Sequence, residues 1–398
     1  MRKDGRIGVS VAGASARSTF LFEYLLAHPE EGFVTGVYDI VPERCSILLD
    51  HYGIGAEAVV YPSLADAVSD PGADAVFVMT TDAAHPECAV AALEAGKSVY
   101  CEKPMAVTMQ GARAIASAAE KARGLFYLGM NLRHSPVHEA LHNIVASGKL
   151  GKVITIEANE HYYGGKTYFR RWNRLRKHGG GLWLTKACHD FDILTWLAGG
   201  RPLRIMASCG LDHYRPRPDA PLYCCECGIA KTCPDYCPPP DGDSLGDRLA
   251  RATERATGVK RDMCLWNSDK DTFDNGMAIV EYDNGSRACY TVNVMSAHTT
   301  RMLVVTGSGG MARADLYDGT VEYWKRHAPE DSCEKMDASA LMTGGHGGAD
   351  ERILADFFRC VRTGSPPRSS WQDGLTSVAL GIAATKSSDT GRIVSVRM

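Results

Sequence analysis

The feature that most constrains this sequence is a regular alternation of short apolar strands and helical segments over the first third of the chain. Apolar strand patterns occur at residues 6–12, 33–38, 74–80, 98–101 and 125–129. Helical patterns lie between them, for example at 85–95 and 108–123. Strands that are joined by helices run parallel, and the helices cover both faces of their sheet. The alternation therefore predicts a doubly wound parallel sheet.

After about residue 130 the pattern changes to strands that are mostly joined without helices. These strand patterns occur at residues 152–160, 203–209, 277–283, 286–294 and 302–306. Asp283-Asn284-Gly285 joins two of them, and Asn-Gly is a strong hairpin signal. We expect a first domain over residues 1–130 and a second over 131–398. The second is predicted to be α/β with a mixed, largely antiparallel, open sheet and a Pro- and Cys-rich insertion at about 212–262.

Composition fits a chain of two soluble domains and excludes several classes of partner. A length of 398 residues suits two domains, and 45% hydrophobic with 23% charged residues is typical of a soluble protein. The net charge of −3 and the lack of polybasic runs argue against nucleic acid and anionic membranes as partners. No apolar run is long enough to span a bilayer. Nine of the 14 cysteines are scattered among apolar segments, which favours a cytoplasmic location.

The turn after the first strand is a candidate nucleotide loop. Dinucleotide-binding turns favour G-x-G-x-x-G, because glycines permit a tight turn and a close approach to the pyrophosphate. Residues 13–18 read GASARS, so serines replace two of the three glycines, and an ordinary strand–turn–helix is the alternative. If the loop binds a dinucleotide, the residues at the cofactor are Gly13, Ser15, Ala16 and Arg17.

Asp39 ends the second strand, where an acidic side chain accepts hydrogen bonds from the ribose hydroxyls of a dinucleotide. The same carboxylate repels a 2′-phosphate, so this position favours NAD over NADP. The alternative for Asp39 is a helix N-cap ahead of Pro42. Arg44 leaves NADP as the less favoured cofactor.

Further motifs follow at the ends of later strands and in the second half of the chain. They are Thr80, Thr81 and His85 after the third strand, Glu102-Lys103-Pro104 at the end of the fourth, Asn131 and Arg133 in GMNLRHSP, and Gly179-Gly180-Gly181 ahead of His189 and Asp192. With this combination the chain resembles the Gfo/Idh/MocA family, which includes glucose–fructose oxidoreductase and inositol dehydrogenase. The resemblance runs from the first strand to about residue 390.

The resemblance implies a Rossmann domain, then an α/β domain whose open sheet is often used for oligomerisation, so we expect a homodimer or homotetramer. It also implies hydride transfer at a sugar or polyol carbon with bound nicotinamide. Carried over, Lys103 lies beside the nicotinamide and the reacting hydroxyl, and His189 is the acid/base. The other residues then expected at the cofactor are Thr80, Thr81, His85 and Glu102.

The position of Lys103 supports that role on physical grounds. It follows a parallel strand, and open α/β sheets bind ligands outside the carboxyl ends of their strands. A cationic nicotinamide beside it would lower the pKa of the lysine, which suits proton transfer and hydrogen bonding to an alkoxide. The alternative is an ordinary solvated surface lysine.

The segment around His189 departs from the family pattern, which has an Asp four residues before the histidine. Here that position is Thr185, and Lys186 follows it. Lys186 can share a helical face with His189 and leave the imidazole neutral, because neighbouring cations lower the pKa of a histidine. Lys186 could instead grip an anionic or keto substrate group, or pair with Asp190. Asp192 either orients the imidazole or is structural.

An aromatic and basic stretch at 161–172 precedes the triple-glycine turn and could bind a sugar ring, or simply pack as a loop on the second domain. The candidate substrate-binding residues are Lys186, Arg133, Tyr163, Arg171, Trp172 and Asp192.

Five cysteines crowd into residues 224–237. Four thiolates at suitable spacing favour a structural, tetrahedral zinc site, and the candidate ligands are Cys224, Cys227, Cys233 and Cys237. Iron–sulfur ligation fits the spacing less well. Free thiols and local disulfides are the alternatives, the disulfides disfavoured in the cytosol.

These observations predict an NAD-dependent oxidoreductase that acts on a sugar, a polyol or a sugar derivative, with a small carbohydrate as its partner. Two alternatives stay open. One is a glycoside hydrolase that oxidises, eliminates and re-reduces with no net redox change. The other is a non-catalytic sugar or nucleotide sensor on the same fold.

Overall fold

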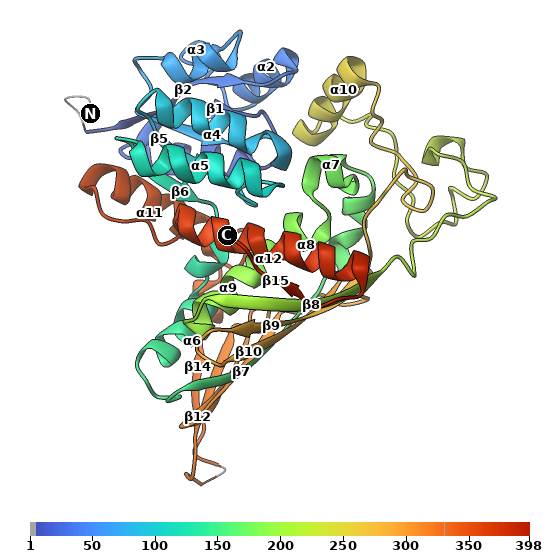
Figure 1. The fold of residues 1–398 in the computed structure, drawn as a ribbon. Helices are drawn as coiled ribbons and strands as arrows, with labels where there is room; N and C mark the ends of the chain where they lie inside the picture. Colours follow the sequence, from blue (N-terminus) through green and yellow to red (C-terminus); the bar gives the residue numbers. More distant parts are fainter. Residues whose placement is uncertain (1–4, 330) are drawn as a thin grey trace.

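The computed structural model describes residues 5–329 and 331–398, which fold around two β-sheets (Figure 1). Residues 1–4 of the predicted first domain and residue 330 of the second lie outside the described residues. One sheet has six parallel strands, and the other has nine strands of mixed direction. The predicted fold class, a doubly wound parallel sheet followed by an α/β region with a largely antiparallel sheet, is confirmed.

The six-stranded sheet has the order β3-β2-β1-β4-β5-β6. Its strands are β1 Ile7–Ala12, β2 Gly32–Tyr38, β3 Val59–Val60, β4 Ala75–Val78, β5 Ser98–Cys101 and β6 Phe126–Leu128. Every residue of β1, β4, β5 and β6 is buried, which explains why these strands read as continuous apolar runs. The strand order reverses between β1 and β4, and ligands of such sheets bind at the carboxyl ends of the strands beside this reversal.

Helices cover both faces of this sheet, as the alternation predicted. They are α1 Thr19–Ala27, α2 Pro42–His51, α3 Leu64–Ser69, the short 3-10 turn η1 Asp82–Ala84, α4 His85–Glu94 and α5 Met109–Lys121. The chain then leaves the sheet through η2 Asn131–His134 and α6 Pro136–Ala146.

The nine-stranded sheet has the order β14-β13-β12-β11-β7-β10-β9-β8-β15. Its strands are β7 Val153–His161, β8 Pro202–Gly210, β9 Asn275–Tyr282, β10 Arg287–Asn293, β11 Met302–Gly307, β12 Gly310–Asp315, β13 Thr320–Lys325, β14 Glu334–Asp337 and β15 Val394–Ser395. The pairing of β7 with β10 is parallel, and the other pairings are antiparallel. One face of the sheet packs on α6 and on α9 (Cys188–Ala198). Buried and exposed residues alternate along β8 and β9, so the opposite face of these strands is open.

Short helical segments connect β7 to α9 and occupy the insertion. They are η3 Tyr163–Phe169, η4 Trp172–Arg174, α7 Arg176–Gly179, α8 Leu182–Thr185, η5 Cys224–Glu226, α10 Leu245–Thr257 and η6 Ser339–Leu341. Leu249 and Ala252 of α10 pack against Val41 and Ile47, so the insertion reaches back to the first sheet's helix α2.

The two C-terminal helices tie the sheets together. Helix α12 (Trp371–Thr390) contacts α5 on one side and β8 and α9 on the other (Figure 1). Helix α11 (Ala349–Thr363) packs into the core of the six-stranded sheet, where the rings of Phe77 and Phe357 lie 4.9 Å apart. Residues 349–363 therefore complete the first core although they follow the second sheet in the chain. None of the helices in residues 5–329 and 331–398 is long and apolar enough to cross a membrane.

Candidate active site

Lys103 links the two halves of the molecule at the carboxyl end of the parallel sheet. It follows β5, and its Nζ donates a hydrogen bond of 3.0 Å to the carbonyl oxygen of Thr185, the last residue of α8. His189 lies one turn further on, in the first turn of α9. Lys103, after β5, and His189, in α9, thus lie near each other.

His189 is buried in a cationic surrounding. Its side chain is 5% exposed, and its Nδ1 has no hydrogen-bond partner among the described residues. Burial lowers the pKa of His189 far below its usual value, and Lys103 and Arg301 lower it further. The imidazole is therefore neutral near pH 7 and can accept a proton, in the direction that the sequence predicted.

The protein's own groups keep Lys103 charged. Burial acts to lower the pKa of Lys103, but the surrounding Cys188, Tyr168, Asp82 and Glu102 side chains raise it above the usual value. The lowering expected from the sequence concerned a bound cationic nicotinamide, and the groups of the chain act in the opposite direction. Lys103 is thus an ammonium group that faces a neutral histidine.

Lys186 forms a buried ion pair with Glu160 of β7, at 2.6 Å between Nζ and Oε1. Arg301 bonds the same carboxylate and also Asp190, at 3.0 Å from Nε to Oδ1. The proposed pairing of Lys186 with Asp190 is therefore wrong, since Arg301 and the Tyr290 hydroxyl occupy that carboxylate. Glu160 lies far from Lys186 in sequence, which is why sequence spacing could not identify it.

Arg133 and Asp192 bind each other. The guanidinium makes two bonds to the carboxylate, 2.8 Å from Nε to Oδ2 and 2.7 Å from Nη2 to Oδ1. Arg133 also bonds Asp373 of α12 at 2.9 Å, and both members of the pair are buried. This geometry favours the structural alternative for Asp192, because both of its oxygens are held by Arg133 rather than by His189.

The turn that follows β1 is built by one glycine and one serine. Gly13 has φ +108°, and a Cβ there would lie 2.6 Å from the carbonyl of Met79, so only glycine fits. The Ser18 hydroxyl donates to the Gly13 carbonyl at 2.6 Å and accepts from the Ser15 amide at 3.1 Å. A serine side chain thus closes the turn that a glycine motif closes by its backbone.

Asp39 joins this loop to the end of β2. Its carboxylate accepts the backbone amides of Ala14 at 2.8 Å and Val41 at 2.9 Å, and Arg44 lies 3.6 Å away. The N-cap position of α2 is Val41, so the alternative of Asp39 as the helix cap is wrong. A carboxylate accepts about four hydrogen bonds, which leaves capacity for a ribose hydroxyl.

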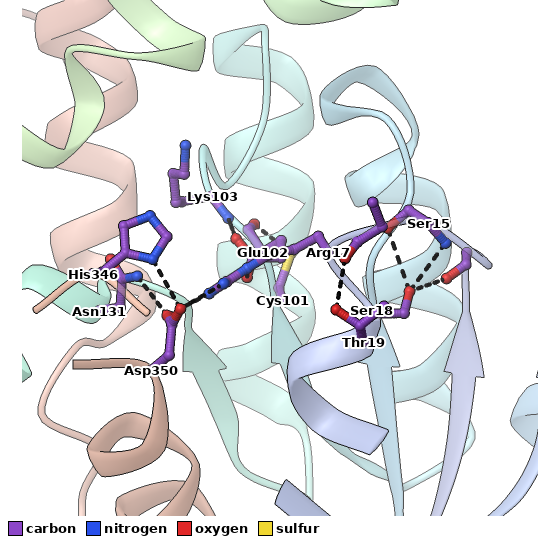
Figure 2. A network of polar contacts seen from close by, with 12 residues as sticks. Ser15, Arg17, Ser18, Thr19, Cys101, Glu102, Lys103, Asn131, His346 and Asp350 are labelled. Atoms are coloured by element: carbon purple, nitrogen blue, oxygen red, sulfur yellow. Dashed lines mark hydrogen bonds and ion pairs between the residues drawn. The ribbon is translucent and has the colours of Figure 1, made fainter. Parts of the chain in front are cut away.

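Arg17 is held by two carboxylates. Its Nε bonds Glu102 at 2.7 Å, and its two terminal nitrogens bond Asp350 of α11 at 2.9 and 2.8 Å (Figure 2). Asn131 and His346 also bond Asp350, at 2.8 and 2.9 Å. This network fixes the dinucleotide loop to β5 and α11. The Arg17 side chain is therefore occupied by protein groups, and only its backbone amide faces no acceptor among the described residues.

His346 is a residue of the site that the sequence analysis missed. Its ring lies 6.5 Å from that of His189, and it has a left-handed backbone with φ 49°. It stands in the run Gly344-Gly345-His346-Gly347-Gly348, whose flexibility in sequence was the available signal. Figure 2 shows its imidazole between Asn131 and Lys103.

The loop after β4 supplies buried polar groups to the same end of the sheet. His85 bonds the carbonyl of Pro104 through Nδ1 at 2.7 Å, while its Nε2 has no partner among the described residues. Asp82 is 5% exposed, and its Oδ2 is likewise unpartnered in the described part of the chain. Thr80 and Thr81 are half-buried beside them.

The aromatic stretch at 161–172 contacts Lys186 through residues other than the three that were predicted to bind substrate. Tyr163 and Arg171 are exposed and Trp172 is half-buried. The ring of Tyr162 instead lies 4.1 Å from the Lys186 ammonium, and that of Tyr168 lies 6.0 Å from it.

Comparison with known proteins matches both halves of this arrangement. Residues 7–130 match the family described as an oxidoreductase family with an NAD-binding Rossmann fold, and residues 143–396 match that family's C-terminal alpha/beta domain. The chain belongs to the Gfo/Idh/MocA oxidoreductase family.

Among curated members of the family, the chain is 27% identical to YteT of Bacillus subtilis (strain 168), which is named as an oxidoreductase, with 87% of each chain covered. It is 25% identical to the 1,5-anhydro-D-fructose reductase of Ensifer adhaerens, over 92% of this chain and 91% of that one. The solved structure of levoglucosan dehydrogenase with NADH and levoglucosan has a TM-score of 0.77 at 15% identity, covering 99% of this chain and 100% of the other.

The residues of this Gfo/Idh/MocA member fit the dinucleotide of the family's Rossmann domain. The backbone amides of Ala16 and Arg17 precede α1 and donate to no acceptor among the described residues, so they can bind a pyrophosphate. Asp39 keeps capacity for a ribose hydroxyl, and three buried groups near Lys103, those of His85, Asp82 and His189, each have a polar atom without a partner among the described residues.

The predicted zinc site is not formed in the insertion of this family member. No three His, Cys, Asp or Glu side chains within residues 5–329 and 331–398 are gathered closely enough to hold a metal ion. Cys225 is exposed, and the Cys237 thiol lies against the carbonyls of Pro238 and Arg261. The chain spacing of Cys224, Cys227, Cys233 and Cys237 suited a metal, but the folded loop does not turn the four thiols to one centre.

Proposed function

We propose that the chain catalyses NAD-dependent hydride transfer between nicotinamide and a hydroxyl-bearing carbon of a sugar, a polyol or a sugar derivative. One observation carries the proposal. A charged Lys103 lies near a buried, neutral His189, whose Nδ1 has no hydrogen-bond partner among the described residues, at the carboxyl end of an NAD-binding sheet. The curated relatives add to it, since they are named as an anhydrofructose reductase and as inositol 2-dehydrogenases.

The two residues have complementary roles in this reaction. Bound nicotinamide supplies the site that accepts or returns hydride. Lys103, held as an ammonium group, hydrogen-bonds the substrate oxygen as it becomes an alkoxide. His189, whose imidazole is neutral, accepts the hydroxyl proton during oxidation and returns it during reduction. Because both groups are largely buried, their charges act in a low-dielectric surrounding.

Incubation of purified protein with NAD and a panel of sugars and polyols tests the proposal by the absorbance of NADH. Formation of NADH with at least one free sugar supports hydride transfer. Release of nitrophenol from a glycoside without net NADH would favour the redox-neutral hydrolase. Tight sugar binding with neither reaction would favour the sensor.

The chain is expected to bind NAD at least about tenfold more tightly than NADP, because a hydrogen bond to a charged group contributes about 1.5–3 kcal/mol. Asp39 accepts from the ribose diol, while Arg44 already lies against Asp39 at 3.6 Å. Titration of both cofactors by protein fluorescence gives the two dissociation constants. Asp39→Ala is expected to remove most of the preference, with exposed Asp66→Ala as the control. Tighter binding of NADP by the unmodified protein would refute the assignment.

We propose that the chain forms a homodimer or homotetramer through the open face of the nine-stranded sheet. Met206, Met277 and Ile279 are 53%, 63% and 50% exposed on this face, and Met206 pairs directly with Ile279. Large exposed apolar patches usually mark interfaces. Light scattering should give a multiple of the chain mass, and Met277→Lys with Ile279→Lys should shift it to the monomer. A monomeric unmodified protein at micromolar concentration would contradict this proposal.

A cytoplasmic location completes the proposal. All fourteen cysteine thiols are free in the structure, and free thiols are typical of a reducing compartment.

A further inference from the structure

Asp82 is a buried carboxyl group at the site for which the proposed reaction has no use. It begins η1, directly after the loop that follows β4, and is 5% exposed. Its Oδ2 has no hydrogen-bond partner among the described residues. Burial of an unpaired polar atom costs free energy, so such an atom in a cleft calls for a functional explanation.

Asp82 and Lys103 follow neighbouring strands of the parallel sheet. Strand β4, which precedes Asp82, pairs with β5, which precedes Lys103, and the His85 ring bonds the carbonyl of Pro104 at 2.7 Å. The Lys103 ammonium donates to the Thr185 carbonyl at 3.0 Å, and Lys103 and the Thr185 side chain both lower the pKa of Asp82. These contacts bring η1, the end of β5 and α8 together at one site.

Other titratable groups around Asp82 are neutral, already paired or turned outward. Glu102 faces it but is paired with Arg17. The Cys101 and Cys188 thiols near it have pKa values raised by burial, and His85 of α4 has a pKa lowered by burial.

Helices α7 and α4 also pack against η1. On α7, Arg176 is bound to Asp389, Lys177 is exposed, and burial lowers the pKa of His178. On α4, Glu87 is exposed. Lys103 is therefore the cation whose charge has the largest effect on the Asp82 carboxyl.

We propose that Asp82 is a positioning residue that sets how much of the Lys103 charge is available to the substrate oxygen. With Asp82 protonated, the ammonium charge of Lys103 is directed to the alkoxide. With Asp82 ionised, the carboxylate takes up that charge and weakens the stabilisation of the alkoxide. The inference rests on the proposed function.

Asp82 is expected to change its protonation state in the pH range in which enzyme activity is usually measured. Burial raises the pKa of Asp82 to about 8, against the lowering by Lys103 and Thr185. Its protonated form therefore predominates near neutral pH and is lost in mildly alkaline solution. A cationic nicotinamide beside Lys103 would lower this pKa, so the reductive direction, with neutral NADH, leaves the titration nearest to that of the protein alone.

The first test uses protein without cofactor, labelled with ¹³C at the aspartate carboxyls. We expect one resonance that titrates near pH 8, is missing from Asp82→Asn and persists in Asp190→Asn, the matched control whose pKa is raised to about 7. Thr185→Val, which removes the side-chain hydroxyl that lowers the pKa of Asp82, should move that midpoint upward. If Asp82→Asn removes no resonance that titrates above about pH 6, the inference is wrong.

The second test follows reduction by NADH of the keto form of whichever substrate the panel identifies. The ratio of kcat/KM for Asp82→Asn to that of the unmodified protein should rise about tenfold from pH 7 to pH 9, because asparagine mimics the protonated acid. A ratio that does not change with pH would show a merely structural role and overturn the inference. Absence of turnover with every substrate would instead refute the proposed function. The carboxyl titration would then still show whether Asp82 changes its protonation state near pH 8.

Discussion

Lys103→Met is expected to lower turnover by about 10²–10⁴-fold, the usual loss when a positioned acid, base or charge is removed. The substitution keeps the length of the side chain but removes the ammonium group that bonds the Thr185 carbonyl. NAD binding should persist, because the loop at 13–18 and Asp39 are untouched. Steady-state rates on the identified substrate and a fluorescence titration with NAD measure the two effects separately.

The exposed Lys177 on α7 provides the matched control for this substitution. Lys177→Met removes one charge from the surface nearby and should leave turnover close to that of the unmodified protein. Turnover by Lys103→Met at the unmodified rate would show that the Glu-Lys-Pro motif has no catalytic role here. The non-catalytic sensor would then be the better account of the chain.

His189→Ala is expected to cause a loss of the same order, about 10²–10⁴-fold, because the hydroxyl proton then has no positioned acceptor. Added imidazole should restore part of the rate if the vacated space admits it. In the unmodified protein His189 should give no inflection near pH 6.5, since burial and the nearby cations hold its pKa well below that value.

The exposed His51 at the end of α2 is the control, and His51→Ala should retain full activity. Unchanged turnover by His189→Ala, with NAD binding intact, would contradict the assignment of His189 as the acid/base. A loss of turnover accompanied by loss of NAD binding would show instead that α9 is disturbed, and a circular dichroism melt would confirm it.

Most of the fold could be predicted from the order of apolar and polar residues within short segments of the sequence. Continuous apolar runs predicted β1, β4 and β5 because these strands are buried on both faces. The two-residue strand β3 is too short and too exposed to leave such a signal. The attachment of helix α11 to the first sheet was not predicted, because an apolar stripe on a helix does not say which core it will join.

The candidate site was predictable where a motif is local and not where partners are distant. Lys103 and His189 were selected from short motifs and the family resemblance that those motifs carry, and the structure places the two side chains near each other. Glu160 as the partner of Lys186, and Asp350 as the partner of Arg17, were not found, since Arg17 and Asp350 are 333 positions apart. The zinc prediction failed for the related reason that four thiols close in sequence need a particular loop conformation to converge.

The sequence by itself determined the order of strands and helices, the turn at Gly13 and the residue types available for proton transfer. These follow from short-range sterics and from burial, which each segment carries in its own pattern. Only the tertiary structure decided which charges meet: Lys186 with Glu160, Arg133 with Asp192, and Arg17 with Asp350. A buried charge is stabilised only by a partner within a few ångströms. The packing of distant elements decides which group that is, and a local sequence pattern does not contain this information.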